Sequence, residues 1–460
     1  MKQRTLLAAV IGLALAGCAI GPDYQRPDDL PAQEQFRSVL TPQQAQSFAD
    51  LSWAEVFGDP ELEAAIATAL KNNLDLRLAA ARVEEFRARS RVARSYLGPE
   101  IRGVGSTAPS PGTPDDSSYS LGLSLNWEID LFGRLRRANE AARAQMLAAE
   151  DFQRGVVNAL VADVASTWFR LRELDAEIEI IERTIRSQEA SLELVRSLKR
   201  NGVASGTEEL QAVSQLSATR AQLPVAQQRR VQTENLMRFL LGSEPGPVTR
   251  SAFTHQLPVP DELPVGIPAQ LLARRPDLRQ LENQLHAATA NVGIAEASRF
   301  PYLSIGLTSF FGLISTDLGS LLDGGDPAND LFSIGPFVDM PIFQSGRGVA
   351  NVDVAEAQLL QSELAYRRGV LLAYREVADA LIVTDKVRNV IEESLVRSNA
   401  AARLLVLQEK RYRAGVVSYL EVLDAQRQLF LAEIELARAR VSQLEGYVEL
   451  YRALGGGWTP

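Results

Sequence analysis

Cys18 is the residue whose type and position most clearly predict chemistry. It is the only cysteine among 460 residues, so no disulfide can form within one subunit. Lys2 and Arg4 precede an apolar or small-residue run, Leu6 to Gly17, which is typical of a signal peptide and too short for a membrane-spanning helix. The run ends in Leu-Ala-Gly-Cys, the pattern of a bacterial lipobox. We therefore predict that residues 1–17 are removed and that Cys18 carries a covalent lipid; the alternative is a buried bystander cysteine.

No other residues have the spacing of a metal site, a phosphate-binding loop or a catalytic site. His255 and His286 have no histidine or carboxylate at ligand spacing, so we expect no metal site. The glycines at 324–325 and 455–457 lack the Lys and Ser/Thr of a phosphate loop. The sequence thus predicts a protein that is not an enzyme and holds no cofactor beyond the lipid.

The net charge of the chain indicates which classes of partner it can bind. The chain has 48 basic and 57 acidic residues, and loss of Lys2 and Arg4 with the leader leaves 46 basic residues and a net charge of −11. This balance argues against nucleic acid as a partner. It fits an acidic pore lining and a solvated acidic surface equally well.

The sequence segments that would position functional residues occur in two copies. Gly133 and Gly346, like Gly202 and Gly415, are related by a shift of 213 positions, the difference between 346 and 133. Upstream, Asp75 and Asp277 are related by a shift of 202 positions, the difference between 277 and 75. The chain is therefore an internal duplication.

Each copy predicts a pair of strands and a helical hairpin. Apolar and polar residues alternate from Tyr119 to Trp127, and again in the second copy at 303–308 and 332–338, with a weaker strand at 101–107. The polar loops that connect the two strands of each copy are expected at 108–118 and 313–329. Apolar faces toward lipid and small polar faces toward water are what a transmembrane barrel needs, but four strands cannot close one. Several subunits must therefore share a barrel.

The segment from Arg134 to Arg200 has no proline, a single glycine, and apolar residues at alternating steps of three and four, with Gln188 as the polar break. This is coiled-coil spacing. A helix of that length would extend roughly 100 Å, far more than a bilayer core, so we place it in water. Glycine signals at Gly202 and Gly415 end the long helices, and Thr207 with the two glutamates behind it can start the next one.

The expected domains follow from these elements: signal peptide 1–17, lipidated arm 18–58, first repeat 59–241 with its strand pair at about 101–127, connector 242–270, second repeat 271–455 with its strand pair at about 302–339, and tail 456–460.

Several motifs together resemble the TolC-like outer membrane efflux proteins, in particular the lipoprotein branch that serves drug-efflux pumps. The resemblance covers Cys18 to Trp458, with one departure at Gly98-Pro99, where an aromatic residue usually precedes the proline. The motifs are Gly21 to Tyr24, Phe57 to Pro60, Trp127 to Arg134, Arg274 to Leu278, Phe300-Pro301 and Leu420 to Gln426.

The resemblance implies a membrane α+β fold. Three subunits with four strands each would close a β-barrel in the outer membrane, continued by an α-helical coiled-coil barrel in the periplasm. It also implies docking to a periplasmic adaptor and an inner-membrane transporter of the resistance-nodulation-division (RND) type. Ala19, in place of an aspartate after the lipidated cysteine, favours the outer membrane over the inner one.

Two sets of residues receive roles from this resemblance. The adaptor-docking tip would comprise Gly202, Val203, Ser205, Gly415, Val416 and Ser418, although the glycines would also simply end helices. The periplasmic gate would comprise Glu208, Tyr412, Glu421 and Asp424, with Arg411 or Arg413 as an ion-pair partner; the alternative is a set of solvated surface charges.

Two other functions compete with the efflux duct for drugs and other small molecules. A type I secretion duct would use the same channel for a polypeptide. A structural periplasmic coiled-coil lipoprotein would explain the helices but not the four alternating strands.

The lipid prediction is tested by intact-mass analysis of the mature protein. We expect a chain that begins at Cys18 and carries acyl mass, because the lipobox places the thiol at the cleavage site. Cys18→Ala should lose the lipid mass. A mature chain that begins upstream of Cys18, or that lacks lipid, would contradict the prediction.

Overall fold

The computed structural model describes residues 19–27, 58–109, 117–251, 274–300, 306–315, 319, 330–337 and 342–456. Cys18 and His255 lie outside this part of the chain. The structure divides into two compact units, one formed by residues 1–30, 80–152 and 277–369, the other by 31–79, 153–276 and 370–460.

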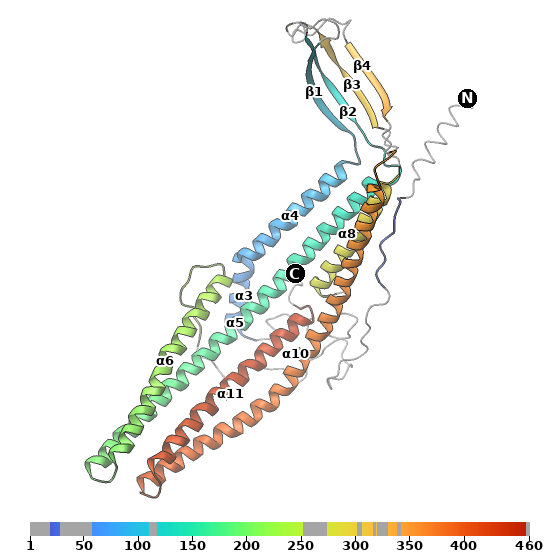
Figure 1. Cartoon of the computed structure of the whole chain (residues 1–460). Helices are drawn as coiled ribbons and strands as arrows, with labels where there is room; N and C mark the ends of the chain where they lie inside the picture. Colours follow the sequence, from blue (N-terminus) through green and yellow to red (C-terminus); the bar gives the residue numbers. More distant parts are fainter. Residues whose placement is uncertain are drawn as a thin grey trace. The chain divides into compact units, whose positions relative to one another are not determined.

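The first unit contains one antiparallel sheet, with the strand order β1-β2-β3-β4 (Figure 1). Because β2 pairs with β3, the sheet joins the two sequence copies. The outer edges of β1 and β4 have no partner strand among the described residues. The strands are β1 Glu100–Pro109, β2 Ser117–Asn126, β3 Gly306–Ser315 and β4 Asp330–Phe337.

Strand boundaries differ from the sequence prediction at several places. Residues 108–109 and 117–118, expected in the first connection, extend β1 and β2, where Ala108 pairs with Ser118. The segment Leu313–Ser315, expected in a connection, belongs to β3 because it finds partners on both sides: Leu313 pairs with Leu121 of β2 and Asp330 of β4. Trp127, expected in a strand, follows the end of β2, and its indole Nε1 donates to the carbonyl of Leu97 at 3.1 Å. The expected strand residues 303–305 and 338 lie outside the described part.

The helices confirm the duplication. The long helices α5 and α10 have 67 residues each and the returning helices α6 and α11 have 35 each, and their bounds differ by the same 213 positions. Helices α4 and α8 have 22 residues each, at the shift of 202. The helices are α3 Pro60–Asn72, α4 Leu74–Ser95, α5 Arg134–Arg200, α6 Gly206–Leu240, α8 Pro276–Ala297, α10 Arg347–Arg413 and α11 Tyr419–Ala453.

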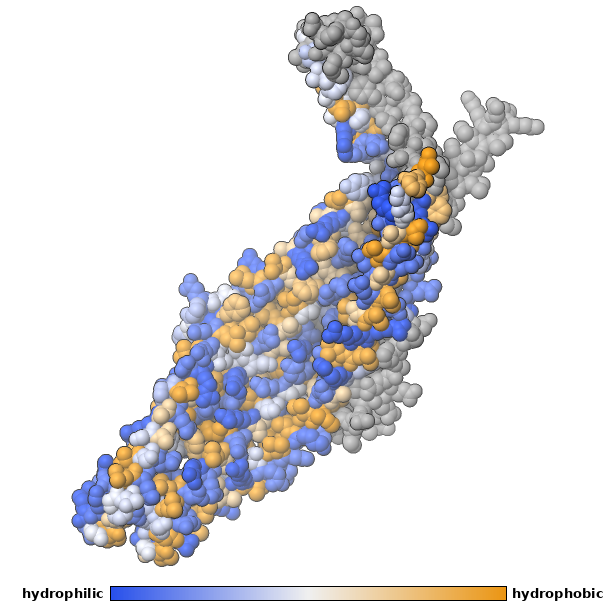
Figure 2. Space-filling model, viewed as in Figure 1, coloured by the Kyte–Doolittle hydropathy of each residue, from blue (hydrophilic) through white to orange (hydrophobic). Residues whose placement is uncertain are grey.

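The second unit packs both hairpins around shared apolar clusters. Near the turns, buried side chains from all four helices form a tip cluster: Leu192, Val195, Ala212, Leu216, Leu405, Tyr412, Tyr419, Val422 and Ala425. Farther from the turns, Ile178, Ile181 and Ala226 form an upper cluster. Hydrophilic residues are distributed over the visible face of these helices (Figure 2), as expected for helices in water. Among the described helices, none has the length and apolar character that crossing a bilayer requires.

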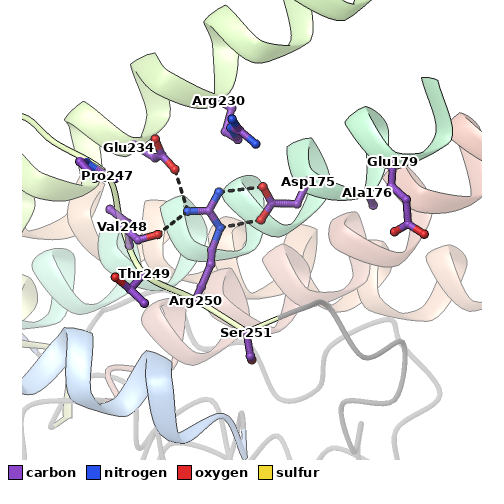
Figure 3. Close-up of a pocket in the computed structure, with 10 residues that line it drawn as sticks. All are labelled: Asp175, Ala176, Glu179, Arg230, Glu234, Pro247, Val248, Thr249, Arg250 and Ser251. Atoms are coloured by element: carbon purple, nitrogen blue, oxygen red, sulfur yellow. Dashed lines mark hydrogen bonds and ion pairs between the residues drawn. The ribbon is translucent and has the colours of Figure 1, made fainter. Parts of the chain in front are cut away.

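A buried arginine attaches the connector to the first hairpin. Arg250, whose side chain is 7% exposed, donates to both carboxylate oxygens of Asp175 at 2.5 and 2.7 Å, to Glu234 at 2.9 Å and to the carbonyl of Val248 at 2.8 Å (Figure 3). These bonds raise the pKa of the guanidinium against the opposing effect of burial. The chain after α6 is therefore held against both α5 and α6.

Removal of Arg250 should destabilise the second unit. Arg250→Ala leaves two partly buried carboxylates without their cation, which typically costs about 3–5 kcal/mol. We expect a lower midpoint in thermal unfolding of purified protein. Arg200→Ala is the control, because Arg200 pairs with Glu193 on the surface and its loss should cost less than about 0.5 kcal/mol. Equal midpoints for the two variants would contradict this role of Arg250.

Candidate functional site

The two hairpin turns have the same backbone geometry. Gly202 and Gly415 have φ values of 72° and 70°, the left-handed region in which a side chain is strained. The Val203 N–H donates to the Leu198 carbonyl at 2.9 Å, and the Val416 N–H donates to the Arg411 carbonyl at 2.9 Å. Both turns are Schellman motifs, so the glycines end the long helices as predicted.

The helices that follow the turns begin differently in the two copies. Ser205, and not Thr207, caps α6: its Oγ accepts from the Glu208 N–H at 3.3 Å, while the Glu208 carboxylate accepts from the Ser205 N–H at 2.7 Å. The spacing Ser-x-x-Glu is the sequence signal of this capping box. Ser418 occupies the same place before α11 but makes no side-chain capping bond.

Both turns expose a valine. Val203 is 70% and Val416 is 65% exposed. Single exposed apolar side chains are ordinary, but here the same residue occurs at equivalent places of two turns whose glycines have open space around them. The structure thus places the predicted tip residues Gly202, Val203, Ser205, Gly415, Val416 and Ser418 in two matched turns at the same end of the hairpins (Figure 1). Their role in docking stays a prediction.

The predicted gate carboxylates have distinct surroundings. Glu208 uses its carboxylate in the capping box. Its repeat equivalent, Glu421, is exposed, and no contact is found for its carboxylate within the described part of the chain. Asp424 accepts from Arg427 at 2.7 Å and from Gln428 at 2.5 Å, and these bonds hold its pKa below the usual value. Asp424 is therefore paired with its own helix and not with Arg411 or Arg413.

Tyr412 lies inside the tip cluster. Its ring is 5.3 Å from the ring of Tyr419, and its buried hydroxyl has no hydrogen-bond partner among the described residues. Burial, followed by the negative charge of Glu208, raises the pKa of Tyr412, and burial raises the pKa of Tyr419 to about 12. Both hydroxyls are protonated at neutral pH. The structure shows Tyr412 packing between α10 and α11, and its role as a tie stays a prediction.

The two hairpins are closed near their turns by different interactions. In the first, Glu209 binds Lys199 at 2.7 Å and Arg196 at 3.1 Å, which lowers its pKa. The equivalents of Lys199 and Glu209 in the second hairpin are Tyr412 and Val422, both buried in the tip cluster. At these equivalent positions the first hairpin has an ion pair and the second has apolar packing.

The segment after Cys18 is docked in a glycine-lined slot of the first unit. Gly133 leaves room for Ala19, since a Cβ added there would approach the Ala19 Cα to 2.6 Å, and a Cβ added at Gly21 would approach the Gly293 Cα to 2.4 Å. Arg137 donates to the carbonyl of Gly21 at 3.2 Å and to Asp23 at 2.7 Å. Sequence reasoning predicted an arm but not these contacts.

No group of three or more metal-ligating side chains occurs in the described ranges. His286 instead contacts Glu140 at 2.9 Å and stacks on Tyr24 at 4.7 Å. A pocket of about 540 Å³ lies beside Arg250, and two of its three carboxylates, Asp175 and Glu234, are bound to that arginine (Figure 3). Asp175, Glu234 and Arg250 therefore have a structural use.

Comparison with known sequences gives matches along nearly the whole chain. A profile of the outer membrane efflux protein family matches residues 65–243 and 267–456. The cation efflux system protein CusC of Escherichia coli is 36% identical, with 100% of both chains covered. The toluene efflux pump outer membrane protein TtgF of Pseudomonas putida is also 36% identical, with 98% of this chain and 96% of the relative covered.

Solved structures agree with the sequence matches. The outer membrane channel OprN aligns with a TM-score of 0.88 at 32% identity, over 96% of this chain and 100% of that one. The open state of the Neisseria gonorrhoeae MtrE outer membrane channel aligns with a TM-score of 0.84 at 30% identity, over 96% and 99% of the two chains.

The gate carboxylates are tested by planar-bilayer recordings of purified protein. Glu421→Ala combined with Asp424→Ala should weaken cation selectivity and block by multivalent cations, because a ring of carboxylates attracts cations. Glu435→Ala is the control, since Glu435 is on the same helix, is half exposed and pairs with Arg397. Unchanged selectivity and block in the double variant would leave Glu421 and Asp424 as surface charges.

Proposed function

Because the chain belongs to the outer membrane efflux protein family, we propose that it is the passive exit duct of a tripartite pump. Its partners in this proposal are a periplasmic adaptor, which docks at the two hairpin turns, and an inner-membrane transporter of the RND type. The lipid on Cys18 belongs to the same proposal.

The membrane location and the fold do not depend on this proposal. The protein is an outer membrane channel component of an efflux pump and has the fold of trimeric outer membrane channels, a β-barrel continued by a helical tunnel. The family is one of transport proteins and not of enzymes.

The observation that carries the docking proposal is the pair of matched turns. Two Schellman motifs at equivalent positions each present an exposed valine, Val203 and Val416. A trimer would present this motif six times around one end, which suits a ring of helical partners whose apolar side chains cover the valines.

The cargo in this proposal is small molecules. Relatives with equal identity are named for cation efflux and for toluene efflux. The same scaffold therefore serves chemically different cargoes, and we assign cargo choice to the inner-membrane transporter.

The proposal is tested in cells that lack this chain but retain a matching adaptor and transporter. The wild-type chain should restore resistance to the cargo of that transporter. Val203→Glu combined with Val416→Glu should abolish resistance, because a charge in a desolvated apolar contact is costly, while the trimers remain intact. Val390→Glu is the control, since Val390 is an exposed valine of α10 away from the turns.

Site-directed cross-linking of adaptor to channel gives the second readout. Cross-links that are unchanged in the turn variant would contradict docking at these turns. Restored export of a polypeptide, with no effect on small-molecule resistance, would favour a secretion duct instead.

A further inference from the structure

A pocket of about 360 Å³ opens in the first unit and is lined by residues of α4, α5 and α8. The described residues that line it have basic, aromatic, amide or alanine side chains, and none is a carboxylate. This composition contrasts with the whole chain, in which 57 acidic residues outnumber 48 basic ones. We call it the α4–α8 pocket and define it by Arg82, Phe86, Gln145, Phe152, Gln280 and Gln284.

The α4–α8 pocket contains a cation that the described part of the chain does not neutralise. The Arg82 guanidinium lies 5.9 Å from the ring centroid of Phe86 and 5.3 Å from that of Phe152, and it pairs with no carboxylate of the described residues. Arg89 lies 5.2 Å from the Phe86 centroid but is paired with Glu85 at 2.5 Å. A guanidinium over a ring uses its planar face, so its N–H donors stay available at the edges. Arg82 therefore offers a positive charge and hydrogen-bond donors to a ligand.

Amide side chains and small buried residues complete the pocket. Gln145 of α5 and Gln280 and Gln284 of α8 form no side-chain hydrogen bond to the described residues, and each amide can both donate and accept. Ala148 and Ala149 are 7% and 6% exposed, and their small side chains leave space that larger residues would fill. Apolar surface with a few convergent polar groups is the usual composition of a small-molecule site.

The duplication shows that this helical fold does not require the cation and the ring. At the shift of 202 that relates α4 to α8, the equivalents of Arg82 and Phe86 are Gln284 and Ala288. Neither residue is charged or aromatic. The positive charge and the ring are therefore a property of the first copy and not of the shared fold.

The position of Arg82 along α4 argues for a soluble ligand and against a phospholipid. Arg82 lies 13 positions before Ser95, the last residue of α4, since 95 minus 82 is 13. At 1.5 Å per residue this places it roughly 20 Å along the helix from that end. Helix α4 leads away from the strands (Figure 1), and the headgroup layer of one leaflet is only about 5–8 Å thick. A lipid headgroup beside the strands therefore does not reach the pocket.

We propose that the α4–α8 pocket binds a small, soluble organic anion. The carboxylate or sulfonate of the ligand accepts hydrogen bonds from Arg82, because a guanidinium fork matches the oxygens of such groups. Its aromatic or aliphatic body packs against Phe152 and the two alanines, and the glutamine amides bond its remaining polar groups. This inference goes beyond the proposed channel function and does not rest on it, because it concerns binding to the folded protein and not conduction.

The first test is titration calorimetry of purified trimers, in nanodiscs of zwitterionic phospholipid, with naphthalene-2-sulfonate as the probe. Arg82→Gln should raise the Kd about tenfold, because the charge-assisted hydrogen bonds to the sulfonate are lost. Arg91→Gln is the matched control. Arg91 is exposed on the same helix, has no carboxylate partner among the described residues and does not line the pocket. Both variants remove one positive charge from α4, so a general electrostatic effect would change both affinities equally.

The second test varies the ligand on the wild-type protein. Inorganic sulfate, which lacks the apolar body, and naphthalene-2-methanol, which lacks the charge, should each bind at least about tenfold more weakly than naphthalene-2-sulfonate. No binding of naphthalene-2-sulfonate to the wild type, or equal Kd values for Arg82→Gln and Arg91→Gln, would overturn the proposal. Sulfate or naphthalene-2-methanol that binds as tightly as the sulfonate would overturn the assignment to an organic anion. None of these outcomes depends on whether the protein conducts.

Discussion

The backbone of a strand in lipid must have every N–H and C=O group paired, and the rest of the structure depends on this constraint. One chain supplies the strand order β1-β2-β3-β4, whose outer edges on β1 and β4 have no partner strand in the described part. Duplication supplies the second strand pair and the β2–β3 contact that joins the copies. A trimeric association, as in the similar outer membrane channels, would remove the remaining edges by pairing the β4 edge of one subunit with the β1 edge of the next. The helical hairpins inherit the same threefold arrangement.

The two copies keep their backbones and differ in their side chains. Helix bounds agree at the shift of 213, and both Schellman turns share their hydrogen bonds. Lys199 and Glu209 form an ion pair in the first hairpin, while their equivalents Tyr412 and Val422 are buried. Ion pairs weaken as salt rises, whereas apolar packing does not. The Glu209 pair also weakens as pH falls through the lowered pKa of that carboxyl. The contacts near the turns of the two hairpins thus respond differently to salt concentration and to pH.

Local signals predicted most of the fold. Glycine ended both long helices where expected, because a Schellman turn requires φ > 0 at one position. The start of α6 was misplaced at Thr207, although Ser205 and Glu208 carry the capping-box spacing. Gln188 stood out as the polar break in the apolar ladder, but nothing in the sequence indicated that Gln426 binds Ser191, one turn farther along α5, from 235 positions away. Arg250 and Asp175 are 75 positions apart. Such contacts depend on how the helices pack against one another. The spacing of residues within one sequence does not predict that packing.

The docked segment after Cys18 changes what a lipid can do for this protein. A lipid on a flexible linker would hold the chain near the membrane. Because the linker is flexible, the lipid would then do little to fix the position and orientation of the folded part. Here Ala19 lies against Gly133, and the Ile20 N–H donates to the Phe132 carbonyl at 3.0 Å. Phe132 and Gly133 connect β2 to α5, and Phe132 stacks on Phe300 at 5.5 Å. Acyl chains on the neighbouring residue, at about 0.8 kcal/mol per buried methylene, would therefore act on the folded unit that carries the sheet. On this argument a lipid on Cys18 would orient the strands at the membrane as well as retain the chain there.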